Sequence, residues 1–139
     1  MEGQLHILIV DAQGGGVGRQ LVAAVRQELP QSRVTAVGAN SAATAAMLKA
    51  GADQGATGEN AVVVACRQAD VILGPIGIVI ADAMLGEITP RMAAAVAQSG
   101  AKRILIPFDH CDNIIVGVPE TSMKNLVRQA VETLLQITS

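Results

Sequence analysis

The chain has 139 residues, of which half are apolar and only 16% are charged, with a formal net charge of −2. This length fits one domain, residues 1–139, that can bury a core without disulfides or metal ions. The acidic balance and the scarcity of aromatic residues exclude a typical nucleic-acid-binding surface, which needs basic patches and stacking rings.

Short apolar runs alternate with segments of helical spacing along the whole chain. In chain order the pattern predicts a strand over 5–10, a helix over 17–29, a strand over 33–38, a helix over 42–50, a strand over 53–56, a helix over 59–68, a strand over 70–74, a short helix over 78–85, a helix over 90–98, a strand over 102–106, a sixth, edge-strand candidate over 113–118 and a helix over 122–137. Asn40 or Ser41, Thr57 and Thr89 are the expected N-caps, and Pro90 takes the first helical position after Thr89.

Strands that alternate with helices predict an α/β fold. We expect a three-layer, Rossmann-like domain with a mostly parallel sheet of five to six strands, helices on both faces and strand order 3-2-1-4-5. The low charge leaves little polar surface for a monomer, so a homodimer is one expectation. The other is that the strands are apolar because both faces of a parallel sheet are buried.

A glycine-rich turn lies between the first predicted strand and helix, where open α/β sheets bind phosphates. Glycines let the backbone approach a phosphate closely, and the N–H groups of the first helical turn face the anion. A tight turn that only brings helix and sheet together is the alternative. The candidate ligand-binding residues of this turn are Asp11, Gln13, Gly14, Gly15, Gly16, Val17, Gly18 and Arg19.

The identity of the ligand is left open by the sequence. The dinucleotide pattern G-x-G-x-x-G has Gln13 at its first glycine, and no acidic residue follows the second strand to hold an NAD ribose. Gly38, Asn40 and Ser41 stand there instead. Asn40, Ser41 and Arg19 would suit a 2′-phosphate, which tilts the interpretation towards NADP. NAD(P) or another nucleotide is therefore the candidate cofactor, and a small phosphorylated ligand the expected partner.

Two other phosphate or cofactor loops resemble this turn. Gly15–Gly18 resembles the deviant loop of ParA-like ATPases, but Arg19 replaces its lysine and Gln20 its hydroxyl residue, so ATP hydrolysis is not expected. Asp11-x-Gln13-x-x-Gly16 resembles the D-x-H-x-x-G motif of cobalamin-binding domains, with Gln13 in place of the metal-ligating histidine. The chain has no tyrosine, which excludes the Tyr-x-x-x-Lys chemistry of short-chain dehydrogenases.

Further candidates follow other strands that end at the same edge of the sheet. The loop after the fourth strand adds Gly74, Pro75, Ile76 and Gly77 as candidate cofactor contacts. Glu59, Asp109 and His110 are weak candidates for acid/base catalysis; a helix-stabilising Glu59 and a solvated 109–112 loop are the alternatives. The two cysteines and two histidines have no metal-ligand spacing, so no metal site is expected.

We expect a cytoplasmic protein that does not enter a membrane. The amino terminus has no secretory pattern, and the longest apolar stretch, 76–85, is interrupted by Gly77 and Asp82 and is too short to span a bilayer.

Several segments together resemble a family of short bacterial proteins of unknown function. They are residues 11–18, 45–52, 55–61, 74–81, 84–90 and 104–107, and the resemblance covers nearly the whole chain. It implies a small Rossmann-like cytoplasmic protein and carries no activity or substrate. Three hypotheses therefore remain: a nucleotide-binding module, a homodimeric enzyme whose site is completed at the interface, and an interaction module with a vestigial nucleotide site.

Overall fold

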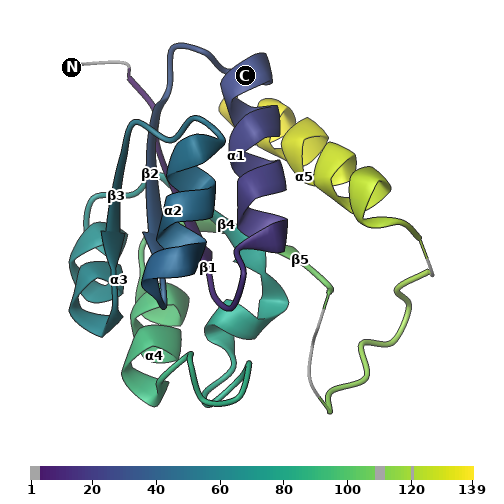
Figure 1. Ribbon diagram of the computed structural model, residues 1–139. Coiled ribbons are helices and arrows are strands. Elements are labelled where there is room, and N and C mark those ends of the chain that lie inside the picture. Colours follow the sequence, from purple (N-terminus) through teal and green to yellow (C-terminus); the bar gives the residue numbers. More distant parts are fainter. Residues whose placement is uncertain (1–3, 109–111, 120) are drawn as a thin grey trace.

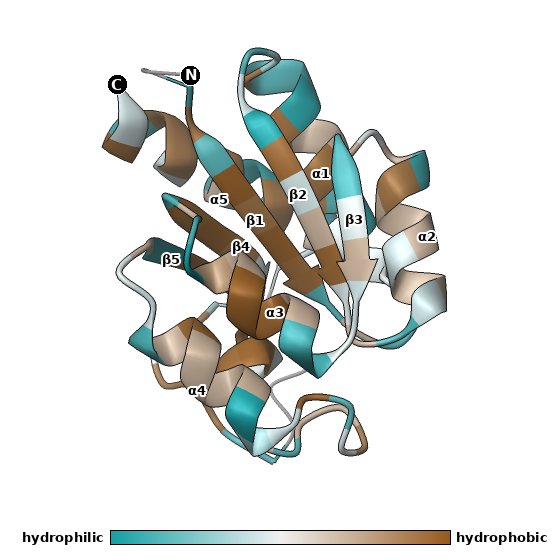
Figure 2. Cartoon of the chain, turned by 90° about the vertical axis from the view of Figure 1, so that its left-hand side faces the viewer, coloured by the Kyte–Doolittle hydropathy of each residue, from teal (hydrophilic) through white to brown (hydrophobic). Residues whose placement is uncertain are grey.

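Five short segments of the chain form one parallel sheet in the order β3-β2-β1-β4-β5, as the sequence predicts (Figure 1). The computed structural model describes residues 4–108, 112–119 and 121–139. The strands are β1 (His6–Asp11), β2 (Arg33–Gly38), β3 (Gln54–Thr57), β4 (Val71–Pro75) and β5 (Lys102–Ile106). The central strands are apolar because both of their faces are buried, whereas β3 is an exposed edge strand (Figure 2).

Helices cover the two faces of the sheet and divide the core in two. The helices are α1 (Gly16–Glu28), α2 (Ser41–Lys49), α3 (Glu59–Cys66), α4 (Pro90–Gln98) and α5 (Met123–Thr138), with a 3₁₀ turn η1 (Ile76–Val79). One core cluster joins β1, β2 and β4 to α1, α2 and α5, and the other joins the opposite face to α3, η1 and α4. Among the described residues, no helix combines the length and the apolar character needed to cross a membrane.

The expected caps are confirmed for two helices and wrong for one. The Asn40 side chain accepts a hydrogen bond from Ala43 N at the start of α2, and Thr89 accepts one from Met92 N ahead of Pro90 in α4. Gly58, not Thr57, precedes α3. The Thr57 hydroxyl instead lies 2.7 Å from the hydroxyl of Thr44 on α2, because Thr57 is still part of the edge strand β3.

Two predicted elements are wrong. No helix spans residues 78–85: after η1 the chain turns repeatedly, with Asp82, Met84 and Leu85 at positive φ, a conformation that no right-handed helix contains. The predicted sixth strand over 113–118 is also absent, since these described residues pair with no strand. Residues 78–85 are rich in apolar side chains because some of them, such as Ile78 and Met84, join the core cluster that contains α4, not because they form a helix.

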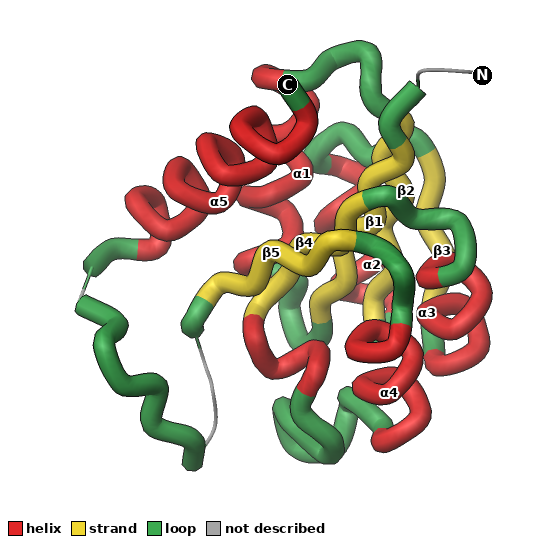
Figure 3. The backbone as a smooth tube through the Cα atoms, turned by 180° about the vertical axis from the view of Figure 1, so that it is seen from behind, coloured by secondary structure: helices red, strands yellow, loops and turns green. Residues whose placement is uncertain are grey.

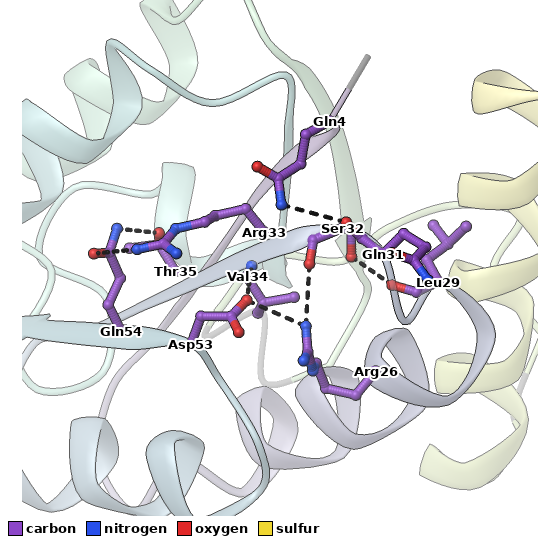
Figure 4. A network of polar contacts seen from close by, with 10 residues as sticks. All are labelled: Gln4, Arg26, Leu29, Gln31, Ser32, Arg33, Val34, Thr35, Asp53 and Gln54. Atoms are coloured by element: carbon purple, nitrogen blue, oxygen red, sulfur yellow. Dashed lines mark hydrogen bonds and ion pairs between the residues drawn. The ribbon is translucent and has the colours of Figure 1, made fainter. Parts of the chain in front are cut away.

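Polar contacts hold the amino-terminal end of the sheet, which lies opposite the glycine-rich turn (Figure 4). The carboxylate of Asp53, just before β3, accepts hydrogen bonds from Arg26 on α1 at 3.1 Å and from the N–H of Val34 on β2 at 2.8 Å. Arg26 also donates to the carbonyl of Ser32. One ion pair thus joins α1, β2 and β3 at the end of the sheet remote from the glycine-rich turn.

Candidate functional site

A pocket of about 260 Å³ opens at the carboxyl edge of the sheet, between the ends of β1 and β4. The chain leaves these two neighbouring strands in different directions, which makes this the switch point where ligands bind in open α/β sheets. Residues from the glycine-rich turn, the β4 end, the following loop, the β5 end and α5 surround it. Its lining residues are Asp11, Ala12, Gln13, Gly14, Gly16, Val17, Gln20, Pro75, Met84, Phe108 and Met123.

Two glycines of the turn are required by the fold itself. Gly15 adopts φ +72°, and a Cβ there would lie 3.0 Å from the backbone of Ala43 on α2. A Cβ on Gly18 would lie 2.6 Å from the Met47 sulfur and 2.9 Å from the Asp11 Cβ. Gly15 and Gly18 therefore allow α1 to pack closely on its neighbours, and they need no ligand to account for them.

The other two glycines of the turn have no such requirement. A Cβ on Gly14 or Gly16 would meet no atom within 4 Å, and neither residue is in the left-handed region. Both line the pocket. Within the described residues, the N–H groups of Gly14 and Gly16 also donate no hydrogen bond. The fold does not account for the absence of side chains at these two positions.

Asp11 places a carboxylate at the floor of the pocket, against the first turn of α1. One oxygen accepts a 2.8 Å hydrogen bond from Ala12 N and the other a 2.6 Å bond from Gly18 N. Burial raises the pKa of Asp11 above its usual value; the hydrogen bonds from the backbone work in the opposite direction, and the charge of Glu87 adds to the increase. This carboxylate already occupies part of the positive end of the helix.

Residues at the β2 end hold loops together and do not line the pocket. The Asn40 amide donates to the carbonyl of Gln13 at 2.9 Å and to the carboxylate of Glu87 at 2.8 Å, and Glu87 also accepts from Gln13 N. Gly38 fits tightly under α2, since its Cβ would lie 2.6 Å from Thr44 N, and Ser41 begins α2. The bonds of Glu87 therefore hold the loop after β4 against the glycine-rich turn, on the side where the sequence predicts a nucleotide ribose.

Only one of the ligand contacts expected from the β4 loop and Arg19 lines the pocket. Pro75 lines the pocket, whereas Gly74 is required internally because its Cβ would lie 2.4 Å from the carbonyl oxygen of Val10. Ile76 and Gly77 form η1 and lie outside the lining. Arg19 is exposed on α1, also outside the lining.

The sequence matches a known protein family over most of its length. A profile described as a domain of unknown function, DUF3842, matches residues 6–139. The chain belongs to this family. No curated protein matches the chain. Membership of DUF3842 carries no activity, so function rests on the geometry of the site.

Of the candidates for acid/base catalysis, Glu59 lies outside the lining of the pocket in this DUF3842 chain. Glu59 begins α3, where it accepts a 2.6 Å hydrogen bond from the Thr89 hydroxyl and pairs with Arg91 at 3.7 Å, which fastens α3 to α4. Asp109 and His110 lie outside the described residues. No group of three histidine, cysteine or carboxylate side chains in the described part of the chain could hold a metal ion.

The sequence did not indicate most of the pocket's apolar wall, nor the Glu87 carboxylate that holds the loop after β4 on the glycine-rich turn. Met84, Phe108 and Met123 come from three separate segments and form that wall with Pro75. Glu87 reaches Gln13 across 74 positions. Glu87 is one of two carboxylates in residues 76–90, with Asp82, and nothing in that stretch indicates what Glu87 contacts.

Proposed function

We propose that the domain binds a phosphorylated small molecule of about mononucleotide size in the pocket beside the glycine-rich turn. The observation that carries the proposal is the pair Gly14 and Gly16. They line the pocket, and neither backbone conformation nor internal packing demands a glycine at these positions. Absent side chains that the fold does not need are best accounted for by a ligand that approaches the backbone closely.

The phosphate is expected at the N–H groups of Gly14 and Gly16, in front of the Asp11 carboxylate. These two donors are unused within the described residues, and they lie at the start of α1, where the helix dipole favours an anion. Arg19 follows Gly16 by three positions and so shares its face of the helix. We expect its guanidinium, which lies outside the pocket lining, to turn towards a bound phosphate and reduce the repulsion from Asp11.

The rest of the ligand is expected to be planar or apolar. Pro75, Met84, Phe108 and Met123 offer an apolar wall, and the flexible methionines can adapt to a ring. The volume of 260 Å³ lies just below the ~300–1,000 Å³ of ordinary ligand pockets, so a whole dinucleotide would extend beyond it. The Asn40–Glu87 contact closes the side where the adenosine half would lie. A mononucleotide therefore fits better than intact NAD(P).

Calorimetric titration with AMP, nicotinamide mononucleotide, NAD and NADP tests the proposal. Gly14→Val and Gly16→Val should each weaken binding by at least about tenfold while the protein stays folded. Gly100→Val is the matched control, because Gly100 also has open space around it and lies away from the pocket. Binding of none of the four probes, or unchanged affinity in both glycine variants, would overturn the proposal. Tighter binding of NAD or NADP than of either mononucleotide would overturn the size assignment.

A further inference from the structure

The strand β5 forms an open edge of the sheet. It pairs with β4 on one side, and no strand of the described chain pairs with the other. Lys102 and Arg103 begin it, but the Arg103 guanidinium folds back onto the carbonyls of Ser99 and Ala101 at 2.7 and 3.2 Å. The apolar remainder, residues 104–106, carries no charge that would discourage the addition of another strand.

Residues 113–118 have the composition of a strand but pair with none. The run Asn-Ile-Ile-Val-Gly-Val is rich in β-branched residues. Ile114 is 88% and Val116 93% exposed, so these two alternate apolar side chains lie in solvent, whereas Val118 is 40% exposed and lines a groove between β5 and α5. The segment runs through an extended loop that projects beyond β5 before α5 begins (Figures 1 and 3).

A groove beside β5 is lined by only the last two residues of this segment, Gly117 and Val118. It lies between β5 and α5 and has a volume of about 280 Å³. Ile104, Ile106, Leu126 and Ala130 give it an apolar lining. The loop reaches it only through residues 117–119 and 121, so Ile114 and Val116 stay outside. One chain thus carries both an open apolar edge and a strand-forming segment that does not occupy it.

We infer that residues 113–118 of each chain pair with β5 of a second copy, with Ile114 and Val116 directed to the partner's groove. A second copy of the chain fits this edge because the open edge of β5 and the unpaired segment 113–118 lie on the same chain. A twofold exchange satisfies both of them at once, because each β5 gains a neighbouring strand and each segment gains a strand to pair with, and symmetry doubles the buried surface. A different protein would satisfy only one of them. The low charge of the chain, 16%, agrees with surface buried between copies.

Light scattering after size-exclusion chromatography tests this inference. The wild type should have twice the 14.2 kDa mass of one chain, and Val116→Asp should have the mass of a single chain. Val116 is exposed, so circular dichroism should show an unchanged fold. Leu85→Asp is the matched control: Leu85 is 98% exposed, lies outside the segment and should leave the dimer intact. A wild type with the mass of one chain, or a Val116→Asp variant that remains dimeric, would overturn the inference.

Hydrogen exchange locates the interface independently. Those amides of residues 104–106 that face away from β4 should exchange more slowly in the wild type than in Val116→Asp, because the partner's segment would bond to the open edge. Equal exchange in the two proteins would refute this interface even if the protein is a dimer. Neither readout depends on ligand binding at the glycine-rich turn.

Discussion

The Asp11 carboxylate accepts a 2.6 Å hydrogen bond from the N–H of Gly18, seven residues later, and this bond ties the end of β1 to the first turn of α1. The two residues fit only as a pair, since a Cβ on Gly18 would lie 2.9 Å from the Cβ of Asp11. The shape of the whole turn depends on this contact, because the glycines that face the pocket lie between its two ends.

Replacement of Asp11 by asparagine should destabilise the protein. Both carboxylate oxygens accept backbone hydrogen bonds in a site that is 3% exposed, and an amide can accept with only one of them. We expect a loss of about 1–3 kcal/mol in the free energy of unfolding, measured with urea. Asp112→Asn, on an exposed residue, should change it by less than about 0.5 kcal/mol. Equal stability of Asp11→Asn and the wild type would show that the bonds to Ala12 and Gly18 contribute nothing.

The stability difference between the wild type and Asp11→Asn should depend on pH. Burial raises the folded-state pKa of Asp11 above the ordinary value of 3.8, so the native protein holds this proton more tightly than the unfolded chain does. The corresponding stability is fully present below about pH 3.8 and is lost as the pH rises through the folded-state pKa. Urea titrations of both proteins over this interval should show the largest difference at the acidic end. A difference that grows with pH would mean that the pKa is lowered.

Glu87 should act as an acceptor that holds the β4–α4 loop on the glycine-rich turn. Glu87→Ala removes the acceptor for Gln13 N and the Asn40 amide, and should cost about 1 kcal/mol in unfolding free energy. Glu87→Gln keeps an oxygen in place and should retain most of that stability. Both variants remove a charge that raises the pKa of Asp11, so the pH interval described above should move to lower pH. An equal loss in the two variants would indicate that the charge, not the acceptor, holds the loop.

The sheet could be predicted from the sequence because its cause is local and periodic. Buried β-branched runs separated by helical spacing define parallel strands, and right-handed crossovers then restrict their order. For residues 78–85 the same reasoning predicts a helix that the structure does not contain. The apolar residues of this segment repeat as they would in a helix, and the residue types of Met84 and Leu85 give no indication of their left-handed conformations.

The position of the glycine-rich turn could be predicted from the sequence, but the contacts around it could not. The turn after the first strand is a local feature, and its glycines were correctly placed at the carboxyl edge. Which glycines the fold needs depends on Ala43 and Met47, more than 25 positions away, so a count of glycines cannot separate Gly15 and Gly18 from the other two. No acidic residue directly follows β2, and the carboxylate that contacts Asn40 there comes from Glu87.

The ion pair between Arg26 and Asp53 should matter more than a surface pair of similar length. Asp53→Ala removes the acceptor of both Arg26 and Val34 N, with both charged side chains about 30% exposed, and should cost about 1–2 kcal/mol (Figure 4). Arg128→Ala breaks the 2.7 Å pair with Glu132 on α5, where both side chains are more than half exposed, and should cost less than about 0.5 kcal/mol. Urea unfolding compares the two variants. Equal losses would mean that the bond to Val34 adds nothing.

Leu85→Gly should stabilise the protein. Leu85 adopts φ +59° with its side chain almost fully in solvent, so the side chain gives no packing to offset a left-handed conformation that costs about 1–2 kcal/mol in a residue with a Cβ. Glycine removes that strain but adds freedom to the unfolded chain, and a net gain of about 0.5–1 kcal/mol is expected. Leu85→Ala is the control, since it removes the exposed side chain and keeps the Cβ; it should change stability by less than about 0.5 kcal/mol. Thermal and urea unfolding of the three proteins make the comparison. If alanine stabilises as much as glycine, the gain comes from removing an exposed apolar group and the backbone at Leu85 is not strained.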